Sequence, residues 1–395
     1  MAHRRSLEAD DCRGDGRPLI PYGRHQVDQS DIDAVVRVLQ SDWLTTGPII
    51  GEFERALSDY TGAPHAVAVS SGTAALHCAA YAMGITTDDE VIVPAITFAA
   101  TANCVIAMGA RPVIVDVDSD TLLMDVDAVR KHIGSRTKAI IAVDYAGQPC
   151  DYPALKAIAD EHGLSLISDA CHALGAAWNG RSVADIADAA VYSFHPVKHI
   201  TTGEGGAIVT RHAHVAERMR RFRNHGIDSD LHRRREQATW SYEVVDLGFN
   251  YRITDFQCAL GLSQLKKADH WIERRRRIAS QYDQAFESMD GISPLRVYDN
   301  VRHVYHLYVV RISDAGRTDK RKAIFRVMRE KGIGVNVHYI PLNLHRFYQH
   351  RAGAVKGQCP VAESVYETIL SLPVYPAMRD ADVHLVIDTL QAAFN

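Results

Sequence analysis

Hydrophobic residues along the chain recur in two patterns that alternate with each other. The segment 30–41 places Ile32, Val35, Val36 and Leu39 at the i, i+3, i+4, i+7 spacing of a helix, and a second helix is predicted at 51–62. After it, short and continuously apolar runs alternate with helical patterns as far as residue 210. Continuous apolar strands are typical of parallel sheets that are buried on both faces. The pattern therefore predicts an α/β fold, with a mostly parallel seven-stranded sheet and helices on both of its faces.

The pattern changes in the last third of the chain. Residues 259–286 predict one long helix, and apolar segments at 305–312 and 335–341 follow with a helix at 322–332 and a final helix. This indicates a smaller α+β domain. We expect a polar, mobile arm at 1–17, a large domain with N-terminal helices at 18–255, and the linking helix with the small domain at 256–395.

Composition and charge exclude several classes of protein. The 395 residues are 47% hydrophobic and 23% charged, and the formal net charge is −4, which gives no general attraction to nucleic acid or an anionic membrane. Seven cysteines without a C-x-x-C pair indicate reduced thiols in a cytoplasmic protein. No run of 18 uncharged apolar residues is present, so the sequence predicts neither a membrane span nor export.

Candidate chemistry collects at the carboxyl ends of the predicted strands, where open α/β sheets bind ligands. The first stretch has Ser71, Gly72 and Thr73 between a strand and a helix. A helix N-terminus with a glycine can hold a phosphate on its unpaired N–H groups. Taken alone, the same residues also fit an ordinary helix cap.

The second stretch places Asp169 at the end of an apolar run, with His172 close behind it. A carboxylate at such a dry position needs a cationic or N–H partner, and a protonated heterocyclic nitrogen is one such partner. The alternative is an aspartate that caps the following turn.

The third stretch has Ser193 at a strand end and Lys198 shortly after it. Desolvation lowers the pKa of a lysine, and a neutral amine can form a Schiff base with an aldehyde. His195 and His199 have the i, i+4 spacing of zinc ligands on a helix, but Pro196 and the missing glutamate of an H-E-x-x-H motif argue against a metal site. We therefore expect no metal.

The fourth stretch carries Asn250 and Arg252 just before a helix, where Thr254 offers the alternative of a simple N-cap region. The four stretches gain weight together. A phosphate cradle, a buried carboxylate for a ring nitrogen and a lysine on strand ends are what a protein must supply to bind pyridoxal phosphate.

These stretches resemble the fold-type I pyridoxal-phosphate enzymes and, more narrowly, the DegT-type sugar-nucleotide aminotransferases. The resemblance covers residues 20–394 and is carried by SDWLTTGP, VSSGTAAL, PAITFAATAN, SDACHALGA, SFHPVKHITTGEGG, GFNYRITDFQCALG and NVHYIPL. The stretches SFHPVKHITTGEGG and VDYAGQPCD are most similar to aminotransferases of pseudaminic acid biosynthesis. The resemblance thus implies transfer of an amino group from glutamate to C4 of a UDP-linked 4-keto-6-deoxy-N-acetylhexosamine.

The resemblance also implies roles for individual residues. Lys198 would bind the cofactor covalently and Asp169 would pair with its ring nitrogen. Asn250 would reach the cofactor of a partner subunit, so a homodimer with shared active sites is expected. The remaining cofactor contacts would be Ser71, Gly72, Thr73, Phe98, His172 and Ser193, and the nucleotide sugar would meet Tyr22, Trp43, Leu44, Thr45, Arg252, His338 and Tyr339.

Other functions remain as alternatives. The chain could aminate another 3- or 4-ketosugar, linked to dTDP or of the bacillosamine or legionaminic type. A sugar dehydratase of the same fold would carry histidine in place of Lys198, and a regulatory binding protein would not need Lys198 and Asp169 together. Arg274–Arg277 are expected on a solvated or interface face, and the basic cluster 232–235 is a candidate contact for a diphosphate.

Overall fold

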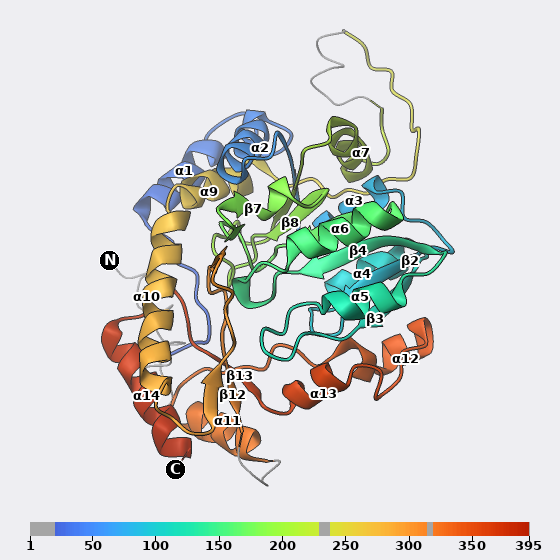
Figure 1. The fold of residues 1–395 in the computed structure, drawn as a ribbon. Helices are drawn as coiled ribbons and strands as arrows, with labels where there is room; N and C mark the ends of the chain where they lie inside the picture. The colour runs from blue at the N-terminus through green and yellow to red at the C-terminus, as the bar shows by residue number, and fades with distance from the viewer. Residues whose placement is uncertain (1–19, 229–237, 314–318, 395) are drawn as a thin grey trace.

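The computed structural model describes residues 20–228, 238–313 and 319–394, and its centre is a seven-stranded sheet (Figure 1). The strand order is β1-β9-β8-β5-β4-β2-β3. Only β9 runs antiparallel to its neighbours, so the predicted mostly parallel sheet is confirmed. The strands are β1 (His65–Val69), β2 (Glu90–Pro94), β3 (Arg111–Val115), β4 (Thr137–Val143), β5 (Ser165–Asp169), β8 (Ala189–Ser193) and β9 (Gly206–Thr210).

Helices cover this sheet in layers. Helix α3 (Gly72–Ala82) packs on β8 and β9 and lies beside α4 (Ala100–Ala107) and α7 (Ala213–Arg223). Helices α5 (Val126–His132) and α6 (Tyr152–His162) pack on each other, and they contact β3 and β5. Helix α3 is buried almost all round, as expected for a helix at the centre of a large core.

The region 259–286 is not one helix, which corrects the sequence prediction. Helix α9 (Asp255–Leu265) ends before Lys266, and α10 (Ala268–Phe286) begins two residues later. The helical pattern of the sequence continues through this break. The two helices have different partners, because α9 packs on α1 (Gln29–Leu39) and α2 (Pro48–Thr61) whereas α10 packs on α14 (Asp380–Phe394) and β10 (Ile292–Pro294).

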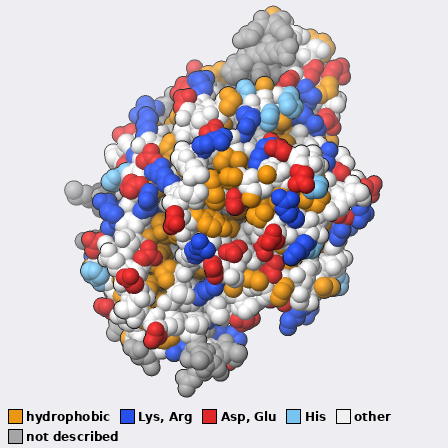
Figure 2. Space-filling view, viewed as in Figure 1, with side chains coloured by type: hydrophobic (Ala, Val, Ile, Leu, Met, Phe, Trp, Pro, Cys, Tyr) orange, Lys and Arg blue, Asp and Glu red, His pale blue; other side chains and the backbone are white. Residues whose placement is uncertain are grey.

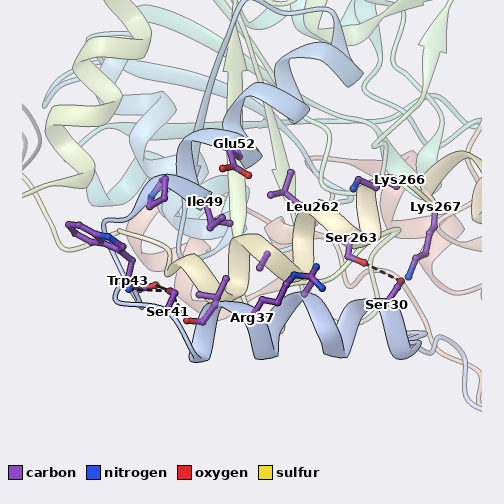
Figure 3. Close-up of a pocket in the computed structure, with 14 residues that line it drawn as sticks. Ser30, Arg37, Ser41, Trp43, Ile49, Glu52, Leu262, Ser263, Lys266 and Lys267 are labelled. Carbon is purple, nitrogen blue, oxygen red and sulfur yellow. Dashed lines mark hydrogen bonds between the residues drawn. The ribbon is translucent and has the colours of Figure 1, made fainter.

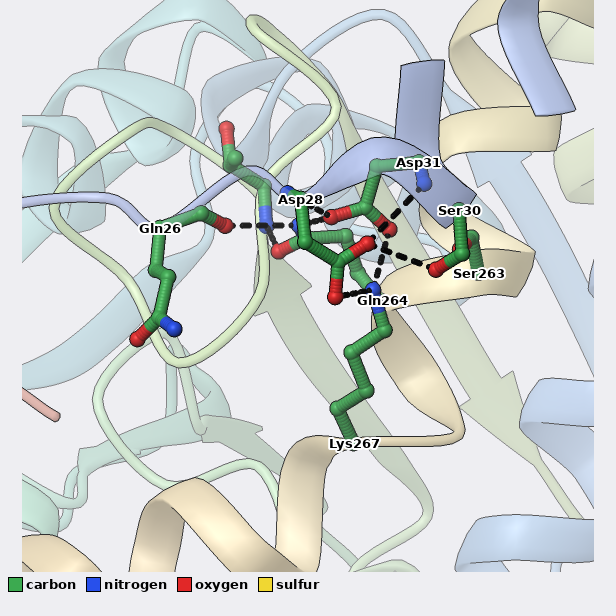
Figure 4. Close-up of polar contacts among 8 residues, drawn as sticks. Gln26, Asp28, Ser30, Asp31, Ser263, Gln264 and Lys267 are labelled. Atoms are coloured by element: carbon green, nitrogen blue, oxygen red, sulfur yellow. Dashed lines mark hydrogen bonds and ion pairs between the residues drawn. The ribbon is translucent and has the colours of Figure 1, made fainter. Parts of the chain in front are cut away.

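Polar contacts join α1 to the turn between α9 and α10 (Figure 4). The ammonium of Lys267 lies 2.8 Å from Asp31 and 2.6 Å from Asp28. Gln264 donates to the same Asp31 carboxylate at 2.7 Å. Asp31 is fully buried, so these donors supply the partners that a buried carboxylate requires.

The apolar stripe of α1 does not face the core of the described chain. Ala34 and Val38 pack against Ala259, while Ile32, Val36 and Leu39 are exposed. Beside them, α1, α2 and α9 enclose a groove of about 580 Å³, and Trp43, Ile49 and Leu262 are among the residues that line it (Figure 3).

The C-terminal part forms a second buried cluster around a three-stranded sheet of β10, β12 (Tyr308–Ile312) and β13 (Ile369–Leu372). The apolar segment 335–341 is not a strand of this sheet and contributes only an isolated bridge between Asn336 and Ser371. The third strand is β13, which comes later in the chain. The remaining helices here are α11 (Lys320–Glu330), α12 (Arg346–Ala352) and α13 (Pro360–Tyr366). A further small sheet has the order β11-β6-β7, in which β6 (Ala177–Trp178) pairs with both β11 (Val301–Arg302) and β7 (Arg181–Ser182). The domain boundaries stay a prediction.

Charged side chains of both signs are mixed over the face seen in Figure 2. The arginine run 274–277 is not uniformly solvated, because Arg275 is fully buried and donates to backbone carbonyls. Among the described residues, every helix is too short or too polar to span a lipid bilayer. The arm 1–17 and the basic cluster 232–235 lie outside the described residues.

Candidate active site

Backbone atoms come very close together where strands β1, β8 and β9 meet the start of α3. Ser71 is the N-cap of α3, and its hydroxyl accepts from the Ala74 N–H at 3.1 Å. A Cβ on Gly72 would lie 2.9 Å from the Cβ of Ser193, and a Cβ on Gly206 would lie 2.5 Å from the carbonyl oxygen of Ser71. Both the cap and the phosphate interpretation of Ser71 fit this geometry, since a capped helix start can also bind an anion.

Asp169, at the end of β5, is buried and has two donors. Its Oδ2 accepts from the Thr101 hydroxyl at 2.7 Å, and Thr101 is joined in turn to Thr97 at 2.7 Å. Its Oδ1 accepts from the Cys171 N–H at 3.3 Å, which is the local turn contact of the alternative interpretation. The carboxylate is thus held in place, and each oxygen keeps a lone pair for a further donor.

Lys198 lies in the loop between β8 and β9, where its backbone N–H donates to the backbone carbonyl of His195 at 2.9 Å. His195 and His199 are therefore in a turn and not on a helix. Burial lowers the pKa of the Lys198 amine, and the neighbouring Cys171 and Asp169 partly oppose this effect. A lowered pKa enlarges the neutral fraction of the amine, which is the form that attacks a carbonyl.

His172, Tyr339 and Phe98 surround the same region. The Tyr339 hydroxyl lies 3.2 Å from Nε2 of His172. The Phe98 ring is 60% exposed and its centroid is 6.1 Å from that of Tyr339. Burial, followed by the charge of Lys198, holds the pKa of His172 well below its ordinary value, so this imidazole is neutral. Phe98 and His172 are both ring neighbours of Tyr339, so this region offers flat side chains to a planar ligand.

Two predicted substrate contacts lie next to this group. The rings of Tyr22 and His338 are 5.6 Å apart, and Nδ1 of His338 lies 2.8 Å from the Ser371 hydroxyl. Burial lowers the pKa of His338 to about 4, with a further contribution from Lys198. Burial also raises the pKa of Tyr22, so both side chains are neutral at pH 7.

The other predicted contacts lie elsewhere in the described chain. Thr45 forms an isolated β-bridge with Thr254, and the carbonyl of Leu44 accepts from the Asp255 N–H at 3.0 Å. Trp43 lines the groove of Figure 3. Asn250 is exposed, and Arg252 donates to the Asn224 side chain at 2.7 Å. Thr254 and Gln257 form a capping box at the start of α9. Within the described part of the chain, no hydrogen bond or ion pair joins Leu44, Thr45, Asn250 or Arg252 to Lys198.

Sequence reasoning missed several members of the site. Thr101 holds Asp169, and the Tyr145 hydroxyl donates to the carbonyl of His338. His306 packs against His172 with ring centroids 4.3 Å apart. These residues come from segments far apart along the chain, and nothing in their local pattern distinguishes them from ordinary core residues. Thr101 and Tyr145 lie within stretches that carry the family resemblance, PAITFAATAN and VDYAGQPCD, but neither residue was given a role there.

The comparisons with known proteins agree with this geometry. Residues 25–391 match the DegT/DnrJ/EryC1/StrS aminotransferase family. The chain belongs to this family. The spore coat polysaccharide biosynthesis protein SpsC of Bacillus subtilis is 39% identical over 376 residues, which cover 94% of this chain and 96% of SpsC.

Solved structures show the same similarity. PseC of Helicobacter pylori, described as an aminotransferase involved in the biosynthesis of pseudoaminic acid, is 33% identical with a TM-score of 0.89, and the match covers 95% of this chain and 99% of PseC. Spr1654 of Streptococcus pneumoniae, solved in a PLP form and a PMP form, is 32% identical with TM-scores of 0.89 and 0.90; the matches cover 95% of this chain and 98% or 99% of Spr1654. The chain is therefore a fold-type I, pyridoxal-phosphate-dependent sugar aminotransferase, as predicted.

The residues present fit this cofactor. A Cβ on Gly206 would lie 2.8 Å from the backbone nitrogen of Gly72, so glycine at this position keeps side-chain atoms away from the first N–H groups of α3, where a phosphate would bind. Asp169 is a buried acceptor on the same sheet edge, and the Nδ1 atom of His172 is buried without a hydrogen-bond partner. Phe98 and His172 supply the flat surfaces described above.

Proposed function

We propose that Lys198 carries the cofactor and that Asp169 holds a proton on its ring nitrogen. The observation that supports this is the placement of the two residues at one edge of the sheet, because Asp169 ends β5 and the buried Lys198 follows the neighbouring strand β8. Ser71, Gly72, Thr73 and Ser193 would hold the phosphate. The ring would lie between Phe98 and His172.

When bound, pyridoxal phosphate supplies an electron sink for the carbanion formed at the amino-bearing carbon. Lys198 Nζ removes the α proton of the amino donor, and later it returns a proton to the sugar carbon that receives the nitrogen. Asp169 keeps the ring nitrogen protonated by accepting its hydrogen bond, while Thr101 holds the carboxylate in place. The neutral His172 adds no positive charge beside the amine.

For the substrate we propose a UDP-linked 4-keto-6-deoxy-N-acetylhexosamine that is aminated at C4, with glutamate as donor. The similarity to PseC supports this proposal. Tyr22, His338 and Tyr339 supply a neutral polar wall beside Lys198, which suits an uncharged sugar ring. Trp43, Leu44, Thr45 and Arg252 are proposed to meet the nucleotide sugar from a partner subunit.

A second candidate is amination of another nucleotide-linked 3- or 4-ketosugar. It is favoured by the 39% identity with SpsC, which is named for a spore coat polysaccharide and not for pseudaminic acid.

An amination assay separates the two candidates. Purified enzyme is given glutamate and, in turn, UDP- and dTDP-linked 3-keto and 4-keto sugars, and the amino sugar is measured by mass spectrometry. We expect the highest kcat/KM with the UDP-linked 4-keto-6-deoxy-N-acetylhexosamine. Activity confined to a 3-keto or a dTDP-linked sugar would replace the first candidate with the second.

The role of Lys198 is tested by Lys198→Ala, with Lys138→Ala on an exposed lysine of β4 as the control. Because the variant lacks the amine that moves the proton, we expect turnover to fall by at least about a thousandfold while the melting temperature is unchanged. Borohydride reduction followed by peptide mass spectrometry reports the attachment site directly. Cofactor trapped on any lysine other than Lys198 would refute the assignment.

The homodimer with shared active sites is also a proposal. It is supported by the exposed side chains of Ile32, Val36 and Leu39 on α1, because monomeric proteins rarely expose such apolar stripes. Cytoplasmic localisation remains a prediction.

A further inference from the structure

Two buried threonine hydroxyls form a chain of hydrogen bonds that ends on the Asp169 carboxylate. The Thr101 hydroxyl lies 2.7 Å from Oδ2 of Asp169, and the Thr97 hydroxyl lies 2.7 Å from that of Thr101. Thr97 and Thr101 are at most 2% exposed, and hydroxyls buried in this way need partners within the protein. Thr101 holds Asp169 in the mechanism described above, whereas Thr97 has no role there.

The number of available protons fixes the direction of both hydrogen bonds. In the proposed mechanism Asp169 is a carboxylate, which has no proton to donate, so the single hydroxyl proton of Thr101 points to Asp169. The Thr101 oxygen can then only accept from Thr97. The Thr97 hydroxyl also lies 3.4 Å from the carbonyl of Phe98, but this oxygen is more distant and already accepts the Thr101 N–H at 3.2 Å. Thr97 therefore donates to Thr101, and Thr101 donates to Asp169.

The hydroxyl of Thr97 strengthens the contact between Thr101 and Asp169. Hydrogen bonds in a chain polarise one another, and the effect is larger in a buried site than in water. A hydroxyl can also rotate about its C–O bond, and an incoming hydrogen bond restricts this rotation. With Thr97 as donor, the Thr101 proton stays directed at Asp169.

The position of Thr97 in the fold connects this chain to a second cofactor contact. Thr97 and Phe98 lie in the turn between β2 and α4, and Thr101 lies in the first turn of α4. The N-cap of α4 is Ala99, whose side chain makes no capping hydrogen bond. The bond from Thr97 to Thr101 therefore helps to fix the turn that carries Phe98 as well as the donor of Asp169.

We propose that Thr97 is a positioning residue for the aminotransferase reaction. Its hydroxyl orients Thr101 and, through Thr101, the Asp169 carboxylate that accepts from the ring nitrogen. It also helps to hold the turn from which Phe98 would stack on the ring. The inference rests on the proposed role of Asp169.

The test removes the Thr97 hydroxyl with little change in the shape of the side chain. In the Thr97→Val holoenzyme we expect kcat to fall about fivefold, the scale of one lost hydrogen bond, with KM for the sugar changed less than about twofold. Titration of the apoenzyme with pyridoxal phosphate should give a dissociation constant raised about fivefold, because Asp169 and Phe98 both hold the ring less firmly. Thr97→Ser keeps the hydroxyl and should bring both values to within about twofold of wild type.

The matched control is Thr61→Val. Thr61 is also buried, and its hydroxyl donates within its own helix, to the carbonyl of Leu57 at 2.7 Å. We expect this variant to keep the kcat and the cofactor affinity of wild type. Wild-type values in Thr97→Val, equal losses in Thr97→Val and Thr61→Val, or a failure of Thr97→Ser to rescue would each overturn the proposal.

Asp169→Asn separates this inference from the proposed function. If Thr97 acts on kcat through the carboxylate, Thr97→Val should change kcat less than about twofold in a chain that already carries Asp169→Asn. An undiminished fivefold loss in that chain would mean that Thr97 acts by another route, and the inference would be wrong. A normal kcat in Asp169→Asn alone would instead refute the proposed role of Asp169.

Discussion

At the scale of single residues, the sheet beside the site contains a buried carboxyl group, Asp144, whose partners come from a loop, a helix and a neighbouring strand. Asp144 lies directly after β4, is fully buried, and accepts from the Cys150 N–H at 3.0 Å and from the Tyr152 hydroxyl at 2.8 Å. Its other oxygen accepts from Ser168 on β5 at 2.9 Å. Burial raises the pKa of this carboxyl to about 7, although the three hydrogen bonds act in the opposite direction.

The titration of Asp144 predicts a pH dependence of stability. Its folded pKa lies above the unfolded value of 3.8, so between about pH 4 and 7 the folded chain binds a proton that the unfolded chain has lost. Stability from this group therefore falls as pH rises through that window. In Asp144→Asn the amide oxygen can accept from the Cys150 N–H and the Tyr152 hydroxyl, and the amide NH2 can donate to the Ser168 oxygen. Because this amide does not titrate, we expect the decrease in the free energy of unfolding between pH 5 and 7.5 to be about 2 kcal/mol smaller than in wild type.

Urea unfolding at the two pH values measures this difference. Asp151→Asn is the control, because Asp151 caps α6 through the Ala154 N–H and should leave the pH dependence as in wild type. The assignment fails if Asp144→Asn and Asp151→Asn follow the same pH dependence.

At the scale of elements, α1 is attached to α9 by a small apolar contact and by the polar contacts of Figure 4. Asp31 is the buried member of these contacts, and Lys267 is its cation. The attachment positions the loop 43–47, which follows α1 and is tied to α9 through Asp255. That carboxylate accepts from the N–H groups of Gly47 at 2.8 Å and Ile49 at 3.0 Å.

Lys267→Met tests this attachment, because it leaves the buried Asp31 without its cation. We expect the free energy of unfolding to fall by about 2 kcal/mol, because a buried carboxylate loses its charged partner. Lys266→Met is the control, since Lys266 is exposed and forms no ion pair with any described residue. Equal stability of the two variants by urea unfolding would show that Lys267 contributes little.

At the scale of the whole molecule, a single described chain brings Lys198, Asp169 and His172 together but leaves Asn250 exposed and away from them. The extended segment before it carries further exposed apolar side chains, among them Trp240, Val244 and Leu247. If two copies of the chain share their active sites, a single chain will expose both an apolar contact surface and the polar residue that reaches the partner's site. The exposed apolar side chains beside Asn250 agree with this arrangement.

Mixing two inactive variants tests this arrangement. If Asn250 serves the partner's site, a dimer of one Lys198→Ala chain and one Asn250→Ala chain contains one site with neither change. Co-refolding equal amounts should then recover up to about a quarter of wild-type activity, because half of the dimers are mixed and each has one intact site. Without recovery, Asn250 would act within its own chain or not at all.

Much of this organisation was predictable from local pattern. Continuous apolar runs indicated the parallel sheet. The glycines, Asp169 and Lys198 at or after strand ends indicated the cofactor, because its phosphate, its ring nitrogen and its aldehyde each require a particular type of residue there. The prediction of one helix over 259–286 was wrong at Lys266 and Lys267. Residue pattern reports helical periodicity but does not report a change of packing partner.

The sequence alone thus determined the class of fold, the family and the residue types that the chemistry needs, because these depend on periodicity and on motifs that are local in the chain. The tertiary structure decided which side chains meet. It buried Arg275 within a basic run, packed His306 on His172, and turned the apolar stripe of α1 to the surface. His306 and His172 are more than a hundred positions apart in the chain, and Arg275 reaches carbonyls on two separate segments, so only the packing of the helices and strands brings these residues together.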